Sequence, residues 1–419
     1  MKRMFAVGIA GWIALGGISA PAHAQEDAAA ADAAEQLATL KGQLEGMTEQ
    51  VQTLVADVDK LKKFKLSGYV QARWETAENK SDAVAVSGSG PTITPANNER
   101  FYIRRGRLKF TYDSSPLSQA VVYFDGASSG SSINARLLEA YVTLLDPWTV
   151  LHSHALTIGQ MNVPFGYEIE RSSSTRELPE RSRAESILFP GERDRGVKLV
   201  SQWTPRLETM LGIFNGAGIS STEYPTSDPT RGKDFLARVR YAQGSVDAAV
   251  SWYGGHATTA LSAADIETDK TRLGVDVQGY YELPTLGGGT LRAEYFGGKD
   301  VNADSVRRLT TVPGGGGRVL TANAIPSHLA TDFQGGYVMW VQNLGERFQS
   351  AVRYDLYDPN IDRDHDQYER VSLGANFFYD GFTRITLSYD LPMTDVSAAG
   401  GRFVDPHDNL WTVQVQHKF

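Results

Sequence analysis

Cysteine is absent from all 419 residues of the chain. Its absence excludes disulfide bridges, metal–thiolate sites and thiol catalysis together. After residue 24 the sequence also lacks any apolar run long enough to cross a bilayer as a helix. The formal net charge of −8 is small for this length and indicates no polyanionic partner, so we expect no binding to nucleic acid.

Residues 1–24, MKRMFAVGIAGWIALGGISAPAHA, have the pattern of a secretory signal peptide. Two basic residues precede an apolar core at 5–18, and Ala22-His23-Ala24 is a cleavage site of the small-residue type. The core is shorter than a membrane-spanning helix needs, which disfavours the alternative of a membrane anchor. We therefore predict that this segment is removed and that the protein works outside the cytoplasm.

From residue 64 onward, apolar and polar residues alternate with a period of two, as in strands that have one apolar face. Tight turns and long polar segments alternate between the strands. An even strand number with short turns at one end and longer loops at the other is typical of outer-membrane barrels. The sixteen predicted strands are 64–74, 99–112, 118–125, 133–144, 155–163, 195–203, 207–214, 234–241, 245–253, 271–282, 289–297, 332–343, 346–357, 368–379, 383–391 and 408–419.

The predicted fold of residues 64–419 is therefore all-β, a 16-stranded antiparallel transmembrane β-barrel that closes between its first and last strands. The last strand ends at Phe419 on its apolar face, so we expect this ring to face the lipid bilayer. A soluble β-propeller or solenoid is the alternative architecture, but the sequence contains no blade-length repeat that would support it.

A different period precedes the barrel. Apolar residues spaced alternately by three and four indicate an a/d seam, so we predict that residues 25–63 form a periplasmic helical coiled coil. Residues 30–62 would then be available for a periplasmic contact, and a lone amphipathic helix lying on the barrel is the alternative. The seam consists of Leu37, Leu40, Leu44, Met47, Val51, Leu54, Val58 and Leu61.

Four stretches carry a resemblance to a known family: FYIRRGRLKF (101–110), TIGQMNVPFGYEIERSSSTRELPERS (157–182), LFPGERDRGVKL (188–199) and GIFNGAG (212–218). The chain resembles the phosphate-selective porin O and P family of Gram-negative outer membranes. The resemblance implies a homotrimer of sixteen-stranded barrels among lipid and lipopolysaccharide, which passes small anions such as phosphate or pyrophosphate through a narrow pore. The acidity of the loops departs from the phosphate-specific members, which leaves the preferred anion open.

The polar faces of the predicted strands carry about fifteen Lys and Arg residues and about seven acidic residues. Anion pores select with rings or ladders of such cations, so we expect a positive lumen. The alternative is that a wide barrel simply has a mixed polar lumen. A bulge is expected at 104–107, where parity is uncertain. The wall cations that we place at the pore are Arg105, Arg107, Lys109, Arg193, Arg195, Lys198, Arg238 and Arg240.

The long segment 167–194 is the richest of the predicted loops. It has an apolar patch at 187–190, which a loop in free solvent would not need, and long loops with their own packing residues are usually functional. We predict that it folds inward and narrows the pore, with arginines suited to phosphate or carboxylate oxygens. A solvated loop whose charges cancel in ion pairs is the alternative. Its pore arginines are Arg171, Arg176, Arg181, Arg183 and Arg193.

No nucleophile motif accompanies any of the eight histidines, so we expect no catalytic residue, no metal site and no cofactor. Two other functions stay open from the sequence. One is a general, non-specific porin, and the other is a structural tether of the outer membrane that uses the coiled coil.

Overall fold

The computed structural model describes most of the chain. The chain divides into two units, Met1–Lys62 and Lys63–Phe419. The residues that the structure describes are 22–77, 84–87, 90–93, 99–126, 128–129, 132–133, 135–219, 232–261, 264–300, 330–362, 367–393, 396–397, 403–404 and 409–419. The predicted signal peptide falls largely outside these residues.

The first unit is one helix, α1 (Ala22–Lys62). Lys60 and Lys62 lie in its last turn, where positive charge interacts favourably with the helix dipole. All eight residues of the predicted seam are exposed on the single chain, from 47% for Val58 to 69% for Leu61. The helix was correctly predicted, and its coiled-coil pairing stays a prediction. Among the described residues, no helix is long and apolar enough to cross a membrane.

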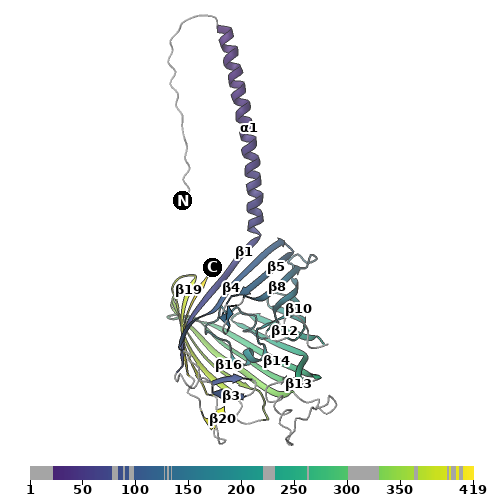
Figure 1. The fold of residues 1–419 in the computed structure, drawn as a ribbon, viewed down its shortest axis with the longest axis vertical. Helices are drawn as coiled ribbons and strands as arrows, with labels where there is room; N and C mark the ends of the chain where they lie inside the picture. The colour runs from purple at the N-terminus through teal and green to yellow at the C-terminus, as the bar shows by residue number, and fades with distance from the viewer. Residues whose placement is uncertain are drawn as a thin grey trace. The chain divides into compact units, whose positions relative to one another are not determined.

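The second unit is a closed antiparallel barrel in which β1 pairs with both β4 and β22 (Figure 1). The predicted sixteen-stranded fold is thereby confirmed. The barrel strands are β1 (Phe64–Ala77), β4 (Arg100–Ser115), β5 (Ser118–Asp125), β8 (Arg136–Leu145), β9 (His154–Asn162), β10 (Arg193–Gln202), β11 (Leu207–Phe214), β12 (Asp234–Gln243), β13 (Val246–Leu261), β14 (Ala264–Leu283), β15 (Gly287–Asp300), β16 (Thr331–Leu344), β17 (Phe348–Asp358), β18 (Tyr368–Phe378), β19 (Thr383–Pro392) and β22 (Leu410–Lys418).

Burial alternates along these strands with the predicted period. In β22 the inward residues Gln414 and Gln416 are buried, whereas the outward residues Trp411 and Val415 are exposed. Because successive residues of a strand face opposite sides, one face is polar and lines the lumen, and the other is apolar and faces lipid.

The end of the chain completes the closure. The backbone N–H of Phe419 donates to the carbonyl of Gly68 at 3.1 Å, and the N–H of Gly68 donates to the carbonyl of Phe419 at 2.9 Å. A side chain at Gly68 would meet the Phe419 ring at 2.7 Å, so the glycine leaves room for the terminal aromatic.

The predicted loop 254–270 is wrong, because β13 and β14 pair residue by residue up to Leu261 and Ala264. Sequence alternation misses this extension because residues 254–270 do not alternate regularly between apolar and polar types. Three small hairpins also lie within predicted loops. They are β2 (Val84–Ser87) with β3 (Gly90–Ile93), β6 (Ser128–Ser129) with β7 (Ser132–Ile133), and β20 (Val396–Ser397) with β21 (Phe403–Val404).

Candidate pore site

Residues 163–192, here called the inward segment, connect β9 to β10 and contact inward-facing side chains around the barrel. The N–H of Gly166 donates to Ser251 of β13 at 3.1 Å. On other strands, Asn376 of β18 donates to the carbonyl of Glu177 at 2.9 Å, and Gln416 of β22 donates to that of Ser174 at 3.0 Å. These partners come from strands that are far apart around the barrel, so the segment lies across the lumen.

An apolar cluster holds the first part of the inward segment. The Phe165 ring packs on Phe189 of the same segment, with centroids 4.8 Å apart, and on Phe296 of β15 at 5.9 Å. Gly274 of β14 lies beneath, where a Cβ would meet the Phe165 ring at 3.0 Å. Leu188 and Phe189 of the apolar patch at 187–190 are therefore packed, as expected of a loop with its own core, whereas Ile187 and Pro190 are exposed.

The segment contains one short helix, α2 (Arg183–Leu188). Ser182 caps it, since its hydroxyl accepts from the N–H of Glu185. The spacing of Ser182 and Glu185 is that of a capping box. The N–H of Arg183 donates to Asp355 of β17 at 3.2 Å, which ties the start of the helix to the wall.

Glu180 is the point at which the segment meets most wall charge. Its carboxylate lies 2.7 Å from Arg73, 2.8 Å from Arg104 and 3.1 Å from Arg105. Burial alone would raise the pKa of Glu180, but Arg105, Arg104 and Arg73 hold it well below its usual range. Adjacent Arg104 and Arg105 both reach it because the β1–β4 register shifts at Gln71/Ala72. The bulge expected at 104–107 is present, and it brings in Arg104, which strict alternation missed.

A second ionic contact joins the segment to β17 and β18. The guanidinium of Arg353 is buried and donates to Asp355 at 3.1 Å, to Glu168 at 3.4 Å and to the carbonyl of Glu180 at 3.0 Å. Arg370 donates to the same Asp355 at 2.9 Å. Breaking such a buried network leaves uncompensated charge, so these contacts fix the position of the segment.

Four of the arginines predicted for this loop, Arg171, Arg176, Arg181 and Arg183, contact other residues of the segment or the wall. Arg181 is buried and pairs with Glu192, and it also donates to the carbonyl of Arg171 at 3.0 Å. Arg176 is buried with its Nη2 3.5 Å from Glu192. The other two stack on aromatic rings, Arg171 over Tyr167 at 4.3 Å and Arg183 over Tyr368 at 4.6 Å.

Several predicted wall cations have carboxylate partners on the wall itself. The pairs are Arg107 with Asp125 at 2.9 Å, Arg193 with Glu139 at 2.9 Å, Arg238 with Asp276 at 3.1 Å and Arg240 with Asp247 at 2.6 Å. Arg195 is half-buried, and its backbone N–H donates to Asp194 at 2.7 Å.

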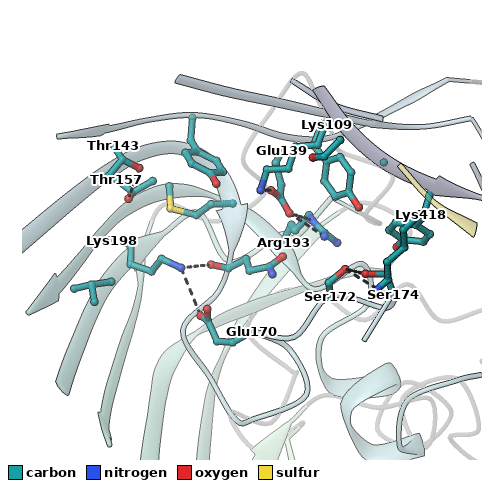
Figure 2. A pocket seen from close by; sticks show the side chains of 18 of the residues that line it. Lys109, Glu139, Thr143, Thr157, Glu170, Ser172, Ser174, Arg193, Lys198 and Lys418 are labelled. Carbon is teal, nitrogen blue, oxygen red and sulfur yellow. Dashed lines mark hydrogen bonds and ion pairs between the residues drawn. The ribbon is translucent and has the colours of Figure 1, made fainter. Parts of the chain in front are cut away.

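A cavity of about 620 Å³ remains between the inward segment and the wall formed by β1, β4, β5, β8, β9, β10 and β22. Figure 2 shows Lys198 pointing toward Glu170 and Arg193 toward Glu139. The charged residues of its lining are Lys109, Glu139, Glu170, Arg193, Lys198 and Lys418, and hydroxyl groups come from Ser67, Tyr69, Tyr123, Tyr141, Thr143, Thr157, Ser172 and Ser174.

The lysines of this cavity have longer carboxylate contacts than Arg193, which lies 2.9 Å from Glu139. Lys198 lies 3.5 Å from Glu170 and donates to the carbonyl of Asn162 at 3.2 Å, and Lys109 lies 3.6 Å from Glu139. Within the described part of the chain, Lys418 forms no ion pair and no side-chain hydrogen bond. The cavity therefore presents ammonium groups that still have donors to offer.

The barrel is similar to the folds of several solved outer-membrane proteins. The outer membrane channel DcaP of Acinetobacter baumannii matches with a TM-score of 0.58 at 14% identity, over 85% of this chain and 97% of that one. The anion-selective porin from Comamonas acidovorans matches with 0.55 at 14% identity, over 85% and 99%. OmpF of Salmonella typhi, in complex with daunomycin, matches with 0.54 at 10% identity, over 85% and 97%.

Such low identities show a shared fold alone. No curated protein sequence matches the chain. A sequence profile of the phosphate-selective porin O and P family, however, matches residues 76–278, which include β4 to β13, the inward segment and most of β14. This match covers just under half of the chain; with the closed barrel, it indicates an outer-membrane porin that is similar to the phosphate-selective porin O and P family.

Proposed function

We propose that this porin conducts small anions, with phosphate and pyrophosphate as the candidate substrates, through the cavity beside the inward segment. The observation that carries the proposal is that Lys109 and Lys198 in that cavity have long carboxylate contacts and that Lys418 has none within the described part of the chain. Conduction requires binding that is strong enough to recruit an ion and weak enough to release it. Ammonium groups without short carboxylate contacts meet both requirements, whereas tightly paired arginines do not.

The inward segment gives the passage its width under this proposal. Its contacts on β13, β15, β17 and β18 lie on strands that do not line the cavity, whereas Glu180 and Ser174 join it to β1, β4 and β22, which do. The cavity lies between the segment and β1, β4, β5, β8, β9, β10 and β22. The anion-selective porin from Comamonas acidovorans has the same fold, which supports this substrate class.

The assembly that we propose is a homotrimer in a Gram-negative outer membrane, with α1 in the periplasm and the signal peptide removed. Exposed apolar residues at every a and d position of α1 support a contact between copies, because a lone helix in water gains nothing from them. A pure tether would use the same helix, but it would need no cation-lined cavity.

The proposal is tested by titrating phosphate, pyrophosphate and sulfate against the chloride current of single channels in planar bilayers. Wild-type protein should show concentration-dependent block, and Lys418→Glu should weaken it several-fold. Lys109→Glu and Lys198→Glu should act in the same direction. Arg206→Glu, which reverses an exposed charge on the turn between β10 and β11, is the matched control and should leave block unchanged. Equal block in all variants would favour a general porin.

A further inference from the structure

Three acidic or phenolic groups lie buried where the inward segment meets β15 and β16. Glu185 of α2 is 1% exposed, and neither of its carboxylate oxygens has a hydrogen-bond partner. Glu294 of β15 has one oxygen without a partner, and the hydroxyl of its cross-strand neighbour Tyr337 has none. Buried polar atoms without partners are rare in native proteins and call for a physical explanation.

Gly166 shows how closely the two carboxylates approach. It has a φ of +65°, and a Cβ there would clash with Oε1 of Glu294 and lie 3.1 Å from Oε1 of Glu185. Because glycine has no Cβ, this position leaves room for both carboxylates. The N–H of Tyr167 donates to Glu294 at 2.6 Å, so Glu294 has a hydrogen-bond donor that Glu185 lacks.

The surrounding cations are already engaged by other acids. Arg353 of β17 forms ion pairs with Glu168 and Asp355, and Arg238 of β12 forms one with Asp276 of β14. Arg181 approaches Glu185 only to 3.7 Å. The titratable and charged groups that face Glu185 and its two acidic neighbours are Glu168, Arg176 and Arg181 of the segment, and Arg238, Asp276, Glu294, Tyr337 and Arg353 of the wall.

We propose that Glu185 is a proton-operated catch, protonated when the inward segment is seated and releasing the segment from the wall when it loses that proton. The catch is a regulatory device and rests on the proposed role of the segment in narrowing the channel. A proton on Glu185 removes a negative charge from beside the carboxyl groups of Glu294 and Glu168, and it supplies the donor for a hydrogen bond to Glu168.

The electrostatics agree with this geometry. Burial, followed by the charges of Glu294 and Glu168, raises the pKa of Glu185 well above its usual range. A carboxyl with a raised pKa in the folded state binds a proton that the released state loses. Seating is therefore fully stabilised at low pH and weakens as pH rises from the ordinary glutamate range through the raised pKa. Arg183 ties α2 to Asp355 of the wall. Release of α2 would therefore free the last part of the inward segment.

Trypsin cleavage of the porin in proteoliposomes, followed from pH 7 to pH 10, tests the catch. Wild-type protein should become cleavable after the arginines of the inward segment at alkaline pH, with a parallel rise in current noise. Glu185→Gln, which is neutral at every pH, should remain uncut across the range. Glu346→Gln, on the exposed turn between β16 and β17, should follow the wild type.

A second variant keeps the test decisive if Glu185→Gln does not fold. Glu294→Gln removes the repelling neighbour, so the transition should move down by about 1 pH unit or more. Absence of an alkaline transition in the wild type, or its persistence in Glu185→Gln, would overturn the catch. Reversal potentials measured on the same preparations report anion selectivity separately, so the catch and the proposed function can fail independently.

Discussion

The carboxylate of Glu180 lies 2.7 Å from the guanidinium of Arg73. One residue belongs to the inward segment and the other to the first strand, and they are 107 positions apart in the chain. With Arg104 and Arg105, this pair means that three arginines of the wall are engaged by one carboxylate of the segment. The cations available for transport are instead the lysines of the adjacent cavity.

Glu180→Gln should loosen the inward segment. The change leaves three arginines without their shared acid, and losing a charged hydrogen-bond partner costs about 1–3 kcal/mol. We expect noisier single-channel currents and faster trypsin cleavage of the segment at neutral pH. The exposed Glu346→Gln is the control, and equal cleavage rates in the two variants would show that Glu180 does not hold the segment.

Phe165→Ala should destabilise the barrel with its seated segment. Phe165 is fully buried between Phe189 and Phe296, and truncating a buried phenylalanine typically costs about 3–5 kcal/mol. The temperature at which folded protein converts to the unfolded gel form should fall. Phe101→Ala, which removes a ring that is 84% exposed, should lower it much less.

Acid should destabilise the turn that follows β8. Burial alone would raise the pKa of Asp146, but hydrogen bonds from the N–H groups of Thr149 and His154 and from the Thr149 hydroxyl lower it to about 2. A lowered carboxyl pKa stabilises the fold above the unfolded pKa, near 3.9, and this contribution is lost as pH falls through about 2. The melting temperatures of the wild type and Asp146→Asn should therefore differ at pH 5 and converge near pH 2. A difference that is independent of pH would contradict the assignment.

Leu40→Asp together with Leu54→Asp should make the oligomer dissociate at a lower temperature while single-barrel conductance is retained. Charge at two d positions of α1 opposes helix pairing, and the barrel strands are untouched. Gln52→Asp with Thr53→Asp adds the same charge outside the seam and serves as the control. Unchanged dissociation of the seam variant on semi-native gels would favour a lone helix.

Strand order was predictable because each crossing has one face in lipid and one in the lumen, which produces the alternation that ends in β22. The β13–β14 extension has no such asymmetry and was missed. Alternation indicates which charged side chains face inward, except at the bulge that brings in Arg104, but it does not indicate how the charges pair. Whether Arg105 meets a solute or Glu180 depends on a bulge in β4 and on the path of the inward segment, and neither follows from local pattern.

The cavity contains two kinds of cation, which differ in whether a carboxylate lies close to them. Arg193 has short bonds to Glu139 and fixes the base of β10, whereas Lys418 at the end of β22 has no such partner in the described part of the chain. The sequence alone does not distinguish them. That distinction decides which side chains an ion meets.

The reversal potential of single wild-type channels across a tenfold KCl gradient tests the central claim most directly. Cavity lysines that recruit anions predict a potential displaced toward the chloride equilibrium value, and Lys418→Glu should move it toward the potassium value. A wild-type potential near zero or on the potassium side, or one that Lys418→Glu leaves unchanged, would contradict the account.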